Sequence, residues 1–313
     1  MTRAGRDALR HTAGAGVTAR AEGMSPLILA CLASTWLIWG STYLAIKWAL
    51  VSLPPFFQMG TRFLAAGALL FLWMRVVRRA PSPTLRQWRH AAWVGALMLG
   101  GGMGGTAYAE QSVESGLVVA FIAVVPIMIA AINAFWKVYP SRLEAVGIVV
   151  GLLGVLMLTQ GAGFKASPAG LVAMALASVT WCLGSVLSQR RWVLAPGATG
   201  FASEMICGGC VLTVMSLAAG EPAAVARSWP FRSEAVLAWV YLVVFGSLIA
   251  FNAYMVLLAR ASAGVASSYT FVNPVIAMLL GVALAGEVVT GYEWSAAAVI
   301  VGGVLLLMAR RWR

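Results

Sequence analysis

The sequence predicts an all-α membrane protein of ten transmembrane helices, built as two inverted five-helix repeats with both termini in the cytoplasm. Composition is the first observation behind this prediction: the 313 residues are 61% hydrophobic and only 10% charged, and their mean hydropathy is +0.88. Soluble domains carry about 25% charged residues. Because the charges are also segregated, long apolar runs remain between them, and nearly all of the chain is used in crossing a membrane.

A series of apolar runs is the second observation, each near the roughly 20 residues that a helix needs to cross the hydrocarbon. In the first half these runs are 25–47, 56–76, 91–109, 116–135 and 143–160. In the second half they are 168–187, 200–219, 235–258, 263–284 and 292–309. The third and fourth runs are the least clearly separated, because only residues 110–115 divide them. Backbone groups find no water in lipid, so each run is expected to be a helix.

The positions of lysine and arginine are the third observation. With the N-terminus inside, 17 of the 22 basic residues fall in inside segments and 3 in outside segments, while Lys47 and Arg62 lie in or at the membrane. This bias supports ten helices with both termini inside. It also explains the net charge of +12 without nucleic-acid binding. Residues 1–24 are basic and rich in Gly and Ala, and a full-length apolar run follows them, so they are predicted to be a disordered cytoplasmic tail.

Aligned features indicate that 25–160 and 168–309 are two copies of one five-helix unit. The aligned pairs are Gly40 with Gly184, Arg62 with Glu204, Pro126 with Pro274, and Glu144 with Glu293. Their offsets are 144, 142, 148 and 149, a drift that loop-length changes would produce. An odd number of helices per copy makes the two copies enter the membrane in opposite directions.

The run from Ile38 to Lys47, which contains Trp39-Gly40-Ser41, resembles the first repeat of the EamA family of the drug/metabolite transporter superfamily. The stretch Arg62-Phe63-Leu64-Ala65-Ala66-Gly67 adds to this likeness, and Asn273-Pro274-Val275 resembles the end of the family's second repeat. The resemblance covers about residues 30–310. It implies a ten-helix bundle of two inverted repeats and secondary transport, usually the export of amino acids or other small metabolites. Some members that the chain resembles export aromatic amino acids and paraquat.

Uncharged polar and aromatic residues in the apolar runs are the candidates for substrate binding. They are Trp39, Ser41, Tyr43, Tyr108, Trp181, Ser185, Asn252, Tyr269 and Asn273. Substrate sites of such transporters form where repeat-related helices meet near the midplane. Aromatic walls with a few hydrogen-bonding groups suit a small amphipathic solute, and an aromatic face also attracts a cation. The alternative for any one Trp or Tyr is a place in the interfacial aromatic belt.

Four other residues are candidates for a gate or hinge. Arg62 and Glu204 either pair and brace a gate, or each extends its charge to the membrane interface. Pro126 and Pro274 each remove a helix hydrogen bond, which provides either a hinge or a static, well-packed kink.

Glu110, at the outer end of the third run, is either a proton carrier or a residue of a solvated loop.

No catalytic residue, cofactor or metal site is predicted. Cys207 and Cys210 have a spacing that suits a metal, but no His, Asp or second Cys pair accompanies them. The glycines at 100–102 lack the Lys-Ser/Thr ending of a phosphate-binding loop, so ATP binding is not supported. The prediction is a monomeric, multi-pass exporter in a bacterial inner membrane, with a small-molecule substrate and the lipid bilayer as its partners. The alternatives are an exporter of cationic aromatic compounds, a channel and a sensor.

Overall fold

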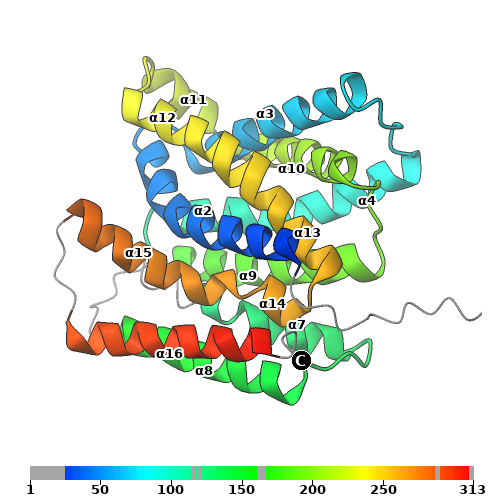
Figure 1. Cartoon of the computed structure of the whole chain (residues 1–313). Coiled ribbons are helices and arrows are strands. Elements are labelled where there is room, and N and C mark those ends of the chain that lie inside the picture. Colours follow the sequence, from blue (N-terminus) through cyan, green and yellow to red (C-terminus); the bar gives the residue numbers. More distant parts are fainter. Residues whose placement is uncertain (1–24, 114–117, 119–120, 161–166, 286–289, 310–313) are drawn as a thin grey trace, which may run out of the picture.

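The computed structural model describes residues 25–113, 118, 121–160, 167–285 and 290–309 (Figure 1). Every element of regular secondary structure in this part of the chain is a helix. The first half contains α2 (Pro26–Leu50), α3 (Pro55–Val76), α4 (Leu85–Gly95), η1 (Ala96–Gly104), α5 (Gly105–Ala109), α7 (Val125–Ala134) and α8 (Arg142–Thr159). The second half contains α9 (Pro168–Arg190), α10 (Ala198–Ala218), α11 (Glu221–Arg227), α12 (Ser233–Tyr241), η2 (Leu242–Phe251), α13 (Asn252–Arg260), α14 (Ala263–Ala266), α15 (Tyr269–Ala285) and α16 (Gly291–Met308).

Seven helical segments of the described chain are long and apolar enough to cross a membrane. They are Pro26–Leu50, Pro55–Val76, Pro168–Arg190, Ala198–Ala218, Ser233–Arg260, Ala263–Leu280 and Gly291–Met308. A shorter apolar helix covers Phe121–Ala134, within the predicted fourth run. The helical membrane fold is therefore confirmed, while the count of ten spans stays a prediction. The predicted tail at 1–24 lies outside the described residues.

Two π-helical segments interrupt long helices and were not predicted. The segment η1 lies between α4 and α5, and η2 lies between α12 and α13. A π-helix is rare, because its wider turn gives poorer backbone packing, and it is found often at functional sites. The two segments begin 146 residues apart, at Ala96 and Leu242. This separation falls within the range of offsets of the sequence repeat.

Two pairs of helices pack at close range through glycines. On α8 and α16, a Cβ added at Gly303 would lie 2.5 Å from the backbone N of Gly151. On α3 and α10, a Cβ added at Gly67 would lie 2.9 Å from the backbone N of Ile206. Small residues allow membrane helices to approach closely in this way. These pairs lie on opposite sides of the bundle in Figure 1, with α8 and α16 at the bottom and α3 and α10 at the top.

Both α8 and α16 begin with a capping box. The Ser141 hydroxyl accepts from the backbone N–H of Glu144, and the Glu144 carboxylate accepts from the backbone N–H of Ser141. Thr290 and Glu293 repeat this exchange at the start of α16. The box satisfies two helix N–H groups that otherwise have no partner. Glu144 and Glu293, which the sequence repeat aligns, therefore have the same local role.

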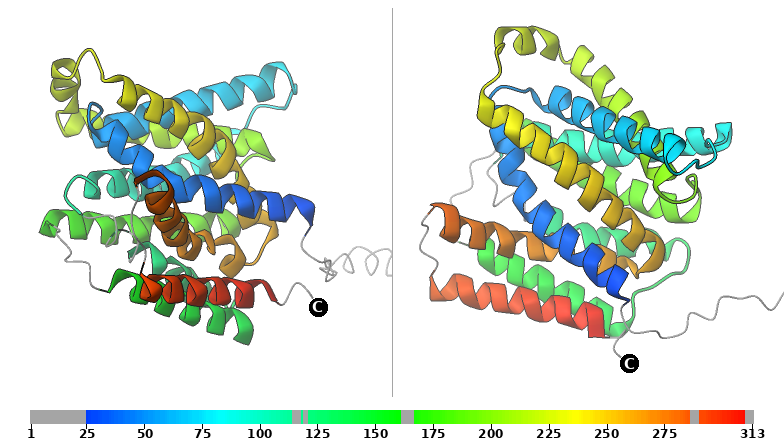
Figure 2. Two further views of the ribbon diagram at one scale, coloured as in Figure 1. Left: turned by 60° about the vertical axis from the view of Figure 1, so that its left-hand side comes forward. Right: turned by 45° about the horizontal axis from the view of Figure 1, so that its top comes forward.

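Other helices, α2 among them, lie between these two pairs. Figure 1 shows α2, α9 and α15 in the middle of the bundle, and both views in Figure 2 keep α16 at the bottom and α3 near the top. We call the end where α2 begins the basic end, because its loops contain Arg78, Arg79, Lys137 and Arg191. It lies on the right in Figure 1. The opposite end, where α2 ends and α3 begins, is called the far end.

Candidate functional site

Four aromatic side chains from four helices pack together near the middle of the bundle. They are Trp39 of α2, Trp181 of α9, Tyr254 of α13 and Tyr269 of α15, and we call them the aromatic cluster. Five pairs of their rings have centroids 4.7 to 5.8 Å apart. All four residues are buried. Edge-on and tilted ring pairs at such distances stabilise a fixed arrangement.

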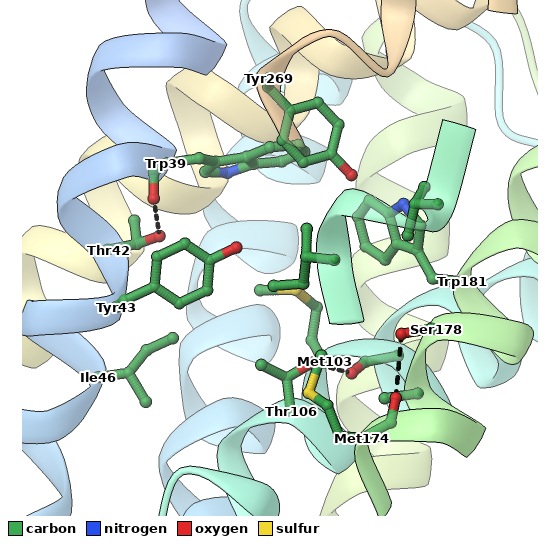
Figure 3. A pocket seen from close by; sticks show the side chains of 14 residues that line it. Trp39, Thr42, Tyr43, Ile46, Met103, Thr106, Met174, Ser178, Trp181 and Tyr269 are labelled. Carbon is green, nitrogen blue, oxygen red and sulfur yellow. Dashed lines mark hydrogen bonds between the residues drawn. The ribbon is translucent and has the colours of Figure 1, made fainter. Parts of the chain in front are cut away.

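Three members of the aromatic cluster, Trp39, Trp181 and Tyr269, form one wall of a hollow of about 60 Å³, which we call the central hollow (Figure 3). The rest of its wall comes from α2, η1, α5, the segment 122–125 and α9. Tyr43, Ile46, Met103, Thr106 and Met174 are among the residues that line it. On α2, η1–α5 and α9 these residues lie in the half of the helix toward the far end.

The central hollow is smaller than the roughly 300 Å³ of a typical ligand pocket. A solute of the size of an amino acid therefore has to displace side chains when it enters. Met103 and Met174 line the hollow and are suited to this, because an unbranched thioether side chain changes shape readily.

Several polar atoms near the central hollow are buried without a hydrogen-bond partner in the described chain. They include the indole N–H of Trp181, both amide atoms of Asn273 and both carboxylate oxygens of Glu110. The Asn273 side chain lies beside the hydroxyl of Tyr43 but makes no hydrogen bond of normal geometry. Because buried polar groups in native proteins are nearly always paired, such atoms indicate a place where a ligand or water completes the bonding.

Other polar groups in the wall are already paired. Thr106 donates to the carbonyl of Gly102 at 2.9 Å, and Ser178 donates to the carbonyl of Met174 at 3.0 Å. These bonds stay within one helix. These two hydroxyls are therefore less available for a new hydrogen bond than the atoms without a partner.

A second hollow, of about 210 Å³, lies toward the basic end. Asn133, Glu144, Gln189 and Arg190 are among the residues that line it, so it is more polar than the central hollow. The Arg190 guanidinium donates to Oδ1 of Asn133 at 3.2 and 3.3 Å. We call it the basic-end hollow.

The structure brings some of the predicted substrate residues together. Trp39, Tyr43, Trp181 and Tyr269 line the central hollow. Asn273 lies beside Tyr43. Ser185 does not line the central hollow but contacts the aromatic cluster directly, because its hydroxyl lies 3.1 Å from that of Tyr254.

Three predicted residues lie elsewhere. The hydroxyl of Ser41 lies 2.6 Å from that of Tyr241, and the Ser41 residue does not line the central hollow. Tyr108 is exposed and stacks on Phe56, with ring centroids 5.8 Å apart. Asn252 donates to the carbonyl of Leu248, one turn earlier in its own helix. These three residues were chosen by their position along an apolar run, which does not predict which side of the helix a side chain occupies.

Arg62 and Glu204 are both fully buried, so neither extends its charge to the membrane interface. The Nε of Arg62 donates to the Ser247 hydroxyl at 2.8 Å, and its guanidinium lies 4.8 Å from the ring centre of Phe63. The Glu204 carboxylate has no hydrogen-bond partner among the described residues. Arg62 and Glu204 do not form an ion pair with each other. The ion pair found among the described residues joins Arg232 and Glu234.

The two predicted hinge prolines differ in their surroundings. The helical segment from Phe121 is interrupted at Val124, and Pro126 is in the first turn of the helix that follows. Pro274 lies inside α15, which continues past it. Only the first proline therefore coincides with a break in helical structure.

The sequence did not indicate Met103, Thr106, Met174 and Ser178 as wall residues. A Met, Thr or Ser in an apolar run gives no signal that separates a residue of a cavity wall from one that faces lipid. The glycine run before Met103 was the available signal. Gly102 lies against Trp181, since a Cβ there would be 3.1 Å from its ring.

A bundle of long apolar helices defines a multi-pass helical membrane protein. Comparison with known proteins agrees. The EamA-like transporter family matches residues 24–160 and, a second time, residues 168–309. The chain therefore belongs to the EamA-like transporter family.

Relatives extend over almost the whole chain. The "Uncharacterized inner membrane transporter YedA" of Escherichia coli K12 is 39% identical over 281 residues, which are 90% of each chain. "Protein PecM" of Dickeya dadantii is 27% identical over 284 residues, 88% of this chain and 91% of that one. A crystal structure with 23% identity has a TM-score of 0.73 and covers 92% of this chain and 99% of its own, which supports the fold. The protein is a multi-pass inner-membrane transporter.

Proposed function

We propose that this protein is a secondary transporter that exports small metabolites by alternating access, with amino acids, aromatic ones included, as its substrates. The observation that carries the proposal is the aromatic cluster with unpaired polar atoms beside it, at a hollow between helices of both halves of the chain. Alternating access exposes one site to each membrane face in turn, and the basic-end hollow, which Pro126 lines, supports a path from that site toward the basic end.

The proposed architecture is ten spans in two inverted five-helix repeats with both termini in the cytoplasm. It is supported by the two successive matches to the same family and by the π-segments that begin 146 residues apart. The charge bias of the loops supports the orientation. In this orientation the basic end is cytoplasmic and the far end is external.

The proposed substrate class follows from the chemistry of the wall. Trp39, Trp181 and Tyr269 present ring surfaces for an apolar side chain. The Trp181 N–H can donate to a carboxylate, and the Asn273 amide can donate to a carboxylate or accept from an ammonium group. A zwitterion with an apolar side chain satisfies both requirements. The described lining has no Lys or Arg, which a sugar phosphate would require.

Counterflow in liposomes tests the proposal. Purified protein is reconstituted with an excess of unlabelled solute inside, and accumulation of labelled solute from outside is followed. The panel contains aromatic, small and basic amino acids, a nucleotide sugar and paraquat. Saturable accumulation of aromatic amino acids is expected. If none of the amino acids accumulates while the protein remains folded, the substrate assignment is wrong.

A cationic aromatic compound is the second candidate, and the aromatic cluster is the observation that favours it. Ring faces attract organic cations by about 0.5 to 2 kcal/mol each. Accumulation of paraquat without accumulation of amino acids would select this candidate. A channel would conduct without saturation and without exchange, so counterflow also separates a channel from a carrier.

A further inference from the structure

Glu110 follows the last residue of α5 and continues the side of the helix that carries Thr106. The backbone N–H of Glu110 donates to the Thr106 carbonyl at 3.0 Å, so the two residues are one turn apart. Thr106 lines the central hollow. Glu110 therefore lies immediately beyond the wall of the central hollow, toward the far end.

The Glu110 side chain is nearly inaccessible, with 7% of its surface exposed. Both carboxylate oxygens lack a hydrogen-bond partner in the described chain. An ionised carboxylate in such a position is destabilising, because it has lost water and gained neither a hydrogen bond nor a close ion pair. The neutral, protonated form avoids this penalty.

Few charged groups face Glu110 from the surrounding helices. From α2, Lys47 acts on the carboxylate and the Tyr43 hydroxyl is close enough to respond to it. On α9, Ala173 and Ala177 approach Gly105 of α5, and Phe56 of α3 stacks on Tyr108. None of these neighbours from α9 and α3 carries a titratable group. Glu114 lies outside the described residues.

Burial raises the pKa of Glu110 to about 8, and Lys47 opposes this rise only in part. At neutral pH the carboxyl is therefore mostly protonated. A new positive charge nearby would lower the pKa of this carboxyl, and the carboxyl would then release its proton.

We propose that Glu110 is the proton-binding group that couples export of a solute to entry of a proton. The inference rests on the proposed function above. The carboxyl holds one proton while the central hollow is empty. When a solute with an ammonium group enters the hollow, the proton leaves to water and the carboxylate balances the ammonium charge. Each state then avoids an uncompensated buried charge, and proton and solute cross the membrane in opposite directions.

Glu204 is the obvious competitor, because it is also buried without a partner. Its surroundings differ. It lies on α10, where its backbone carbonyl packs against Gly95 of α4. Glu204 itself does not line the central hollow. Glu204→Gln is therefore a matched control: it removes a buried carboxyl of the same type away from the hollow.

The test uses the full-length protein in liposomes with labelled phenylalanine. At equal pH on both sides, counterflow measures exchange alone. A pH gradient of one unit is then imposed, for which one-for-one coupling predicts up to tenfold accumulation. Wild type and Glu204→Gln are expected to accumulate solute in response to the gradient. Glu110→Gln is expected to lose this response at solute concentrations at which its own exchange at equal pH is still measurable. A Glu110→Gln protein that still responds to the gradient would overturn the proposal and leave the proposed function intact.

A second measurement needs no substrate. Infrared difference spectra of wild type and Glu110→Gln, recorded from pH 6 to 10, are expected to show the band of a protonated carboxyl that disappears with a midpoint near pH 8. Its absence at pH 7 would overturn the proposal even if no transported solute is found. If the Gln variant fails to fold, Glu110→Asp replaces it, and a midpoint that stays unchanged in that variant would assign the band to another residue.

Discussion

Val125 and Pro126 are consecutive residues that line two different hollows. Val125 lines the central hollow and Pro126 lines the basic-end hollow. The helix is interrupted one residue earlier, at Val124. The boundary between the two hollows therefore falls between consecutive residues, close to the position at which the helix is interrupted.

Replacing Pro126 by Ala is expected to slow exchange several-fold while leaving equilibrium binding nearly unchanged. Alanine supplies the missing N–H and favours a continuous helix, so the boundary between the two hollows becomes stiffer. Initial rates of counterflow and calorimetric binding measure the two effects separately. Pro274→Ala is the control, because α15 already continues through Pro274. Equal slowing in both variants would argue against a specific hinge at Pro126.

Replacing Trp39 by Ala is expected to weaken binding of an aromatic solute by about tenfold or more, since the Trp39 ring lies against three other rings and lines the central hollow. Trp39→Phe keeps a ring and is expected to retain most of the affinity. Binding is measured on folded protein, as judged by its chromatographic profile. Unchanged affinity in the Ala variant would remove Trp39 from the solute site.

Replacing Asn273 by Leu separates a structural role from a binding role. If the amide has no partner in the folded protein, its removal relieves a buried, unsatisfied polar group, and the melting temperature is expected to stay constant or rise. Affinity for an amino acid is expected to fall by about tenfold, because a neutral hydrogen bond to the ligand contributes about 1 kcal/mol or more. A lower melting temperature with unchanged affinity would show that Asn273 has structural partners instead.

Removal of the Ser247 hydroxyl is expected to destabilise the protein. Arg62 is buried, and its Nε donates to this hydroxyl. A hydrogen bond to a charged group contributes about 1.5 to 3 kcal/mol, so Ser247→Ala leaves a buried guanidinium with one bond fewer. Thermal unfolding in detergent measures the effect. Ser34→Ala is the control, because Ser34 is only partly buried and its hydroxyl donates to the Ala30 carbonyl of its own helix. Equal stability of both variants would show that Arg62 is solvated in another way.

Much of this fold was predictable from the sequence, because long apolar runs and separated charges follow directly from the cost of placing polar groups in lipid. The positions of Trp39, Trp181 and Tyr269 at the central hollow followed from repeat-related helices. The two π-segments were not predictable, because a π-turn and an α-turn have the same apolar composition. Tyr108 was assigned to the substrate site because the sequence shows how far a residue lies along its apolar run. It does not show which side of the helix the residue occupies, because that depends on packing.

The same limit applies to the glycines of α16, where two neighbours provide a direct test of helix packing. A Cβ at Gly303 would lie 2.5 Å from the backbone N of Gly151, whereas a Cβ at Gly302 would contact nothing within 4 Å. Backbone atoms of a partner helix cannot move aside without separating α8 from α16. Gly303→Ala is therefore expected to lower the melting temperature by several degrees, since overpacking costs about 1 to 3 kcal/mol. Gly302→Ala is expected to leave it unchanged or raise it slightly, because alanine favours the helix. Similar melting temperatures in the two variants would mean that α8 and α16 do not pack through this face.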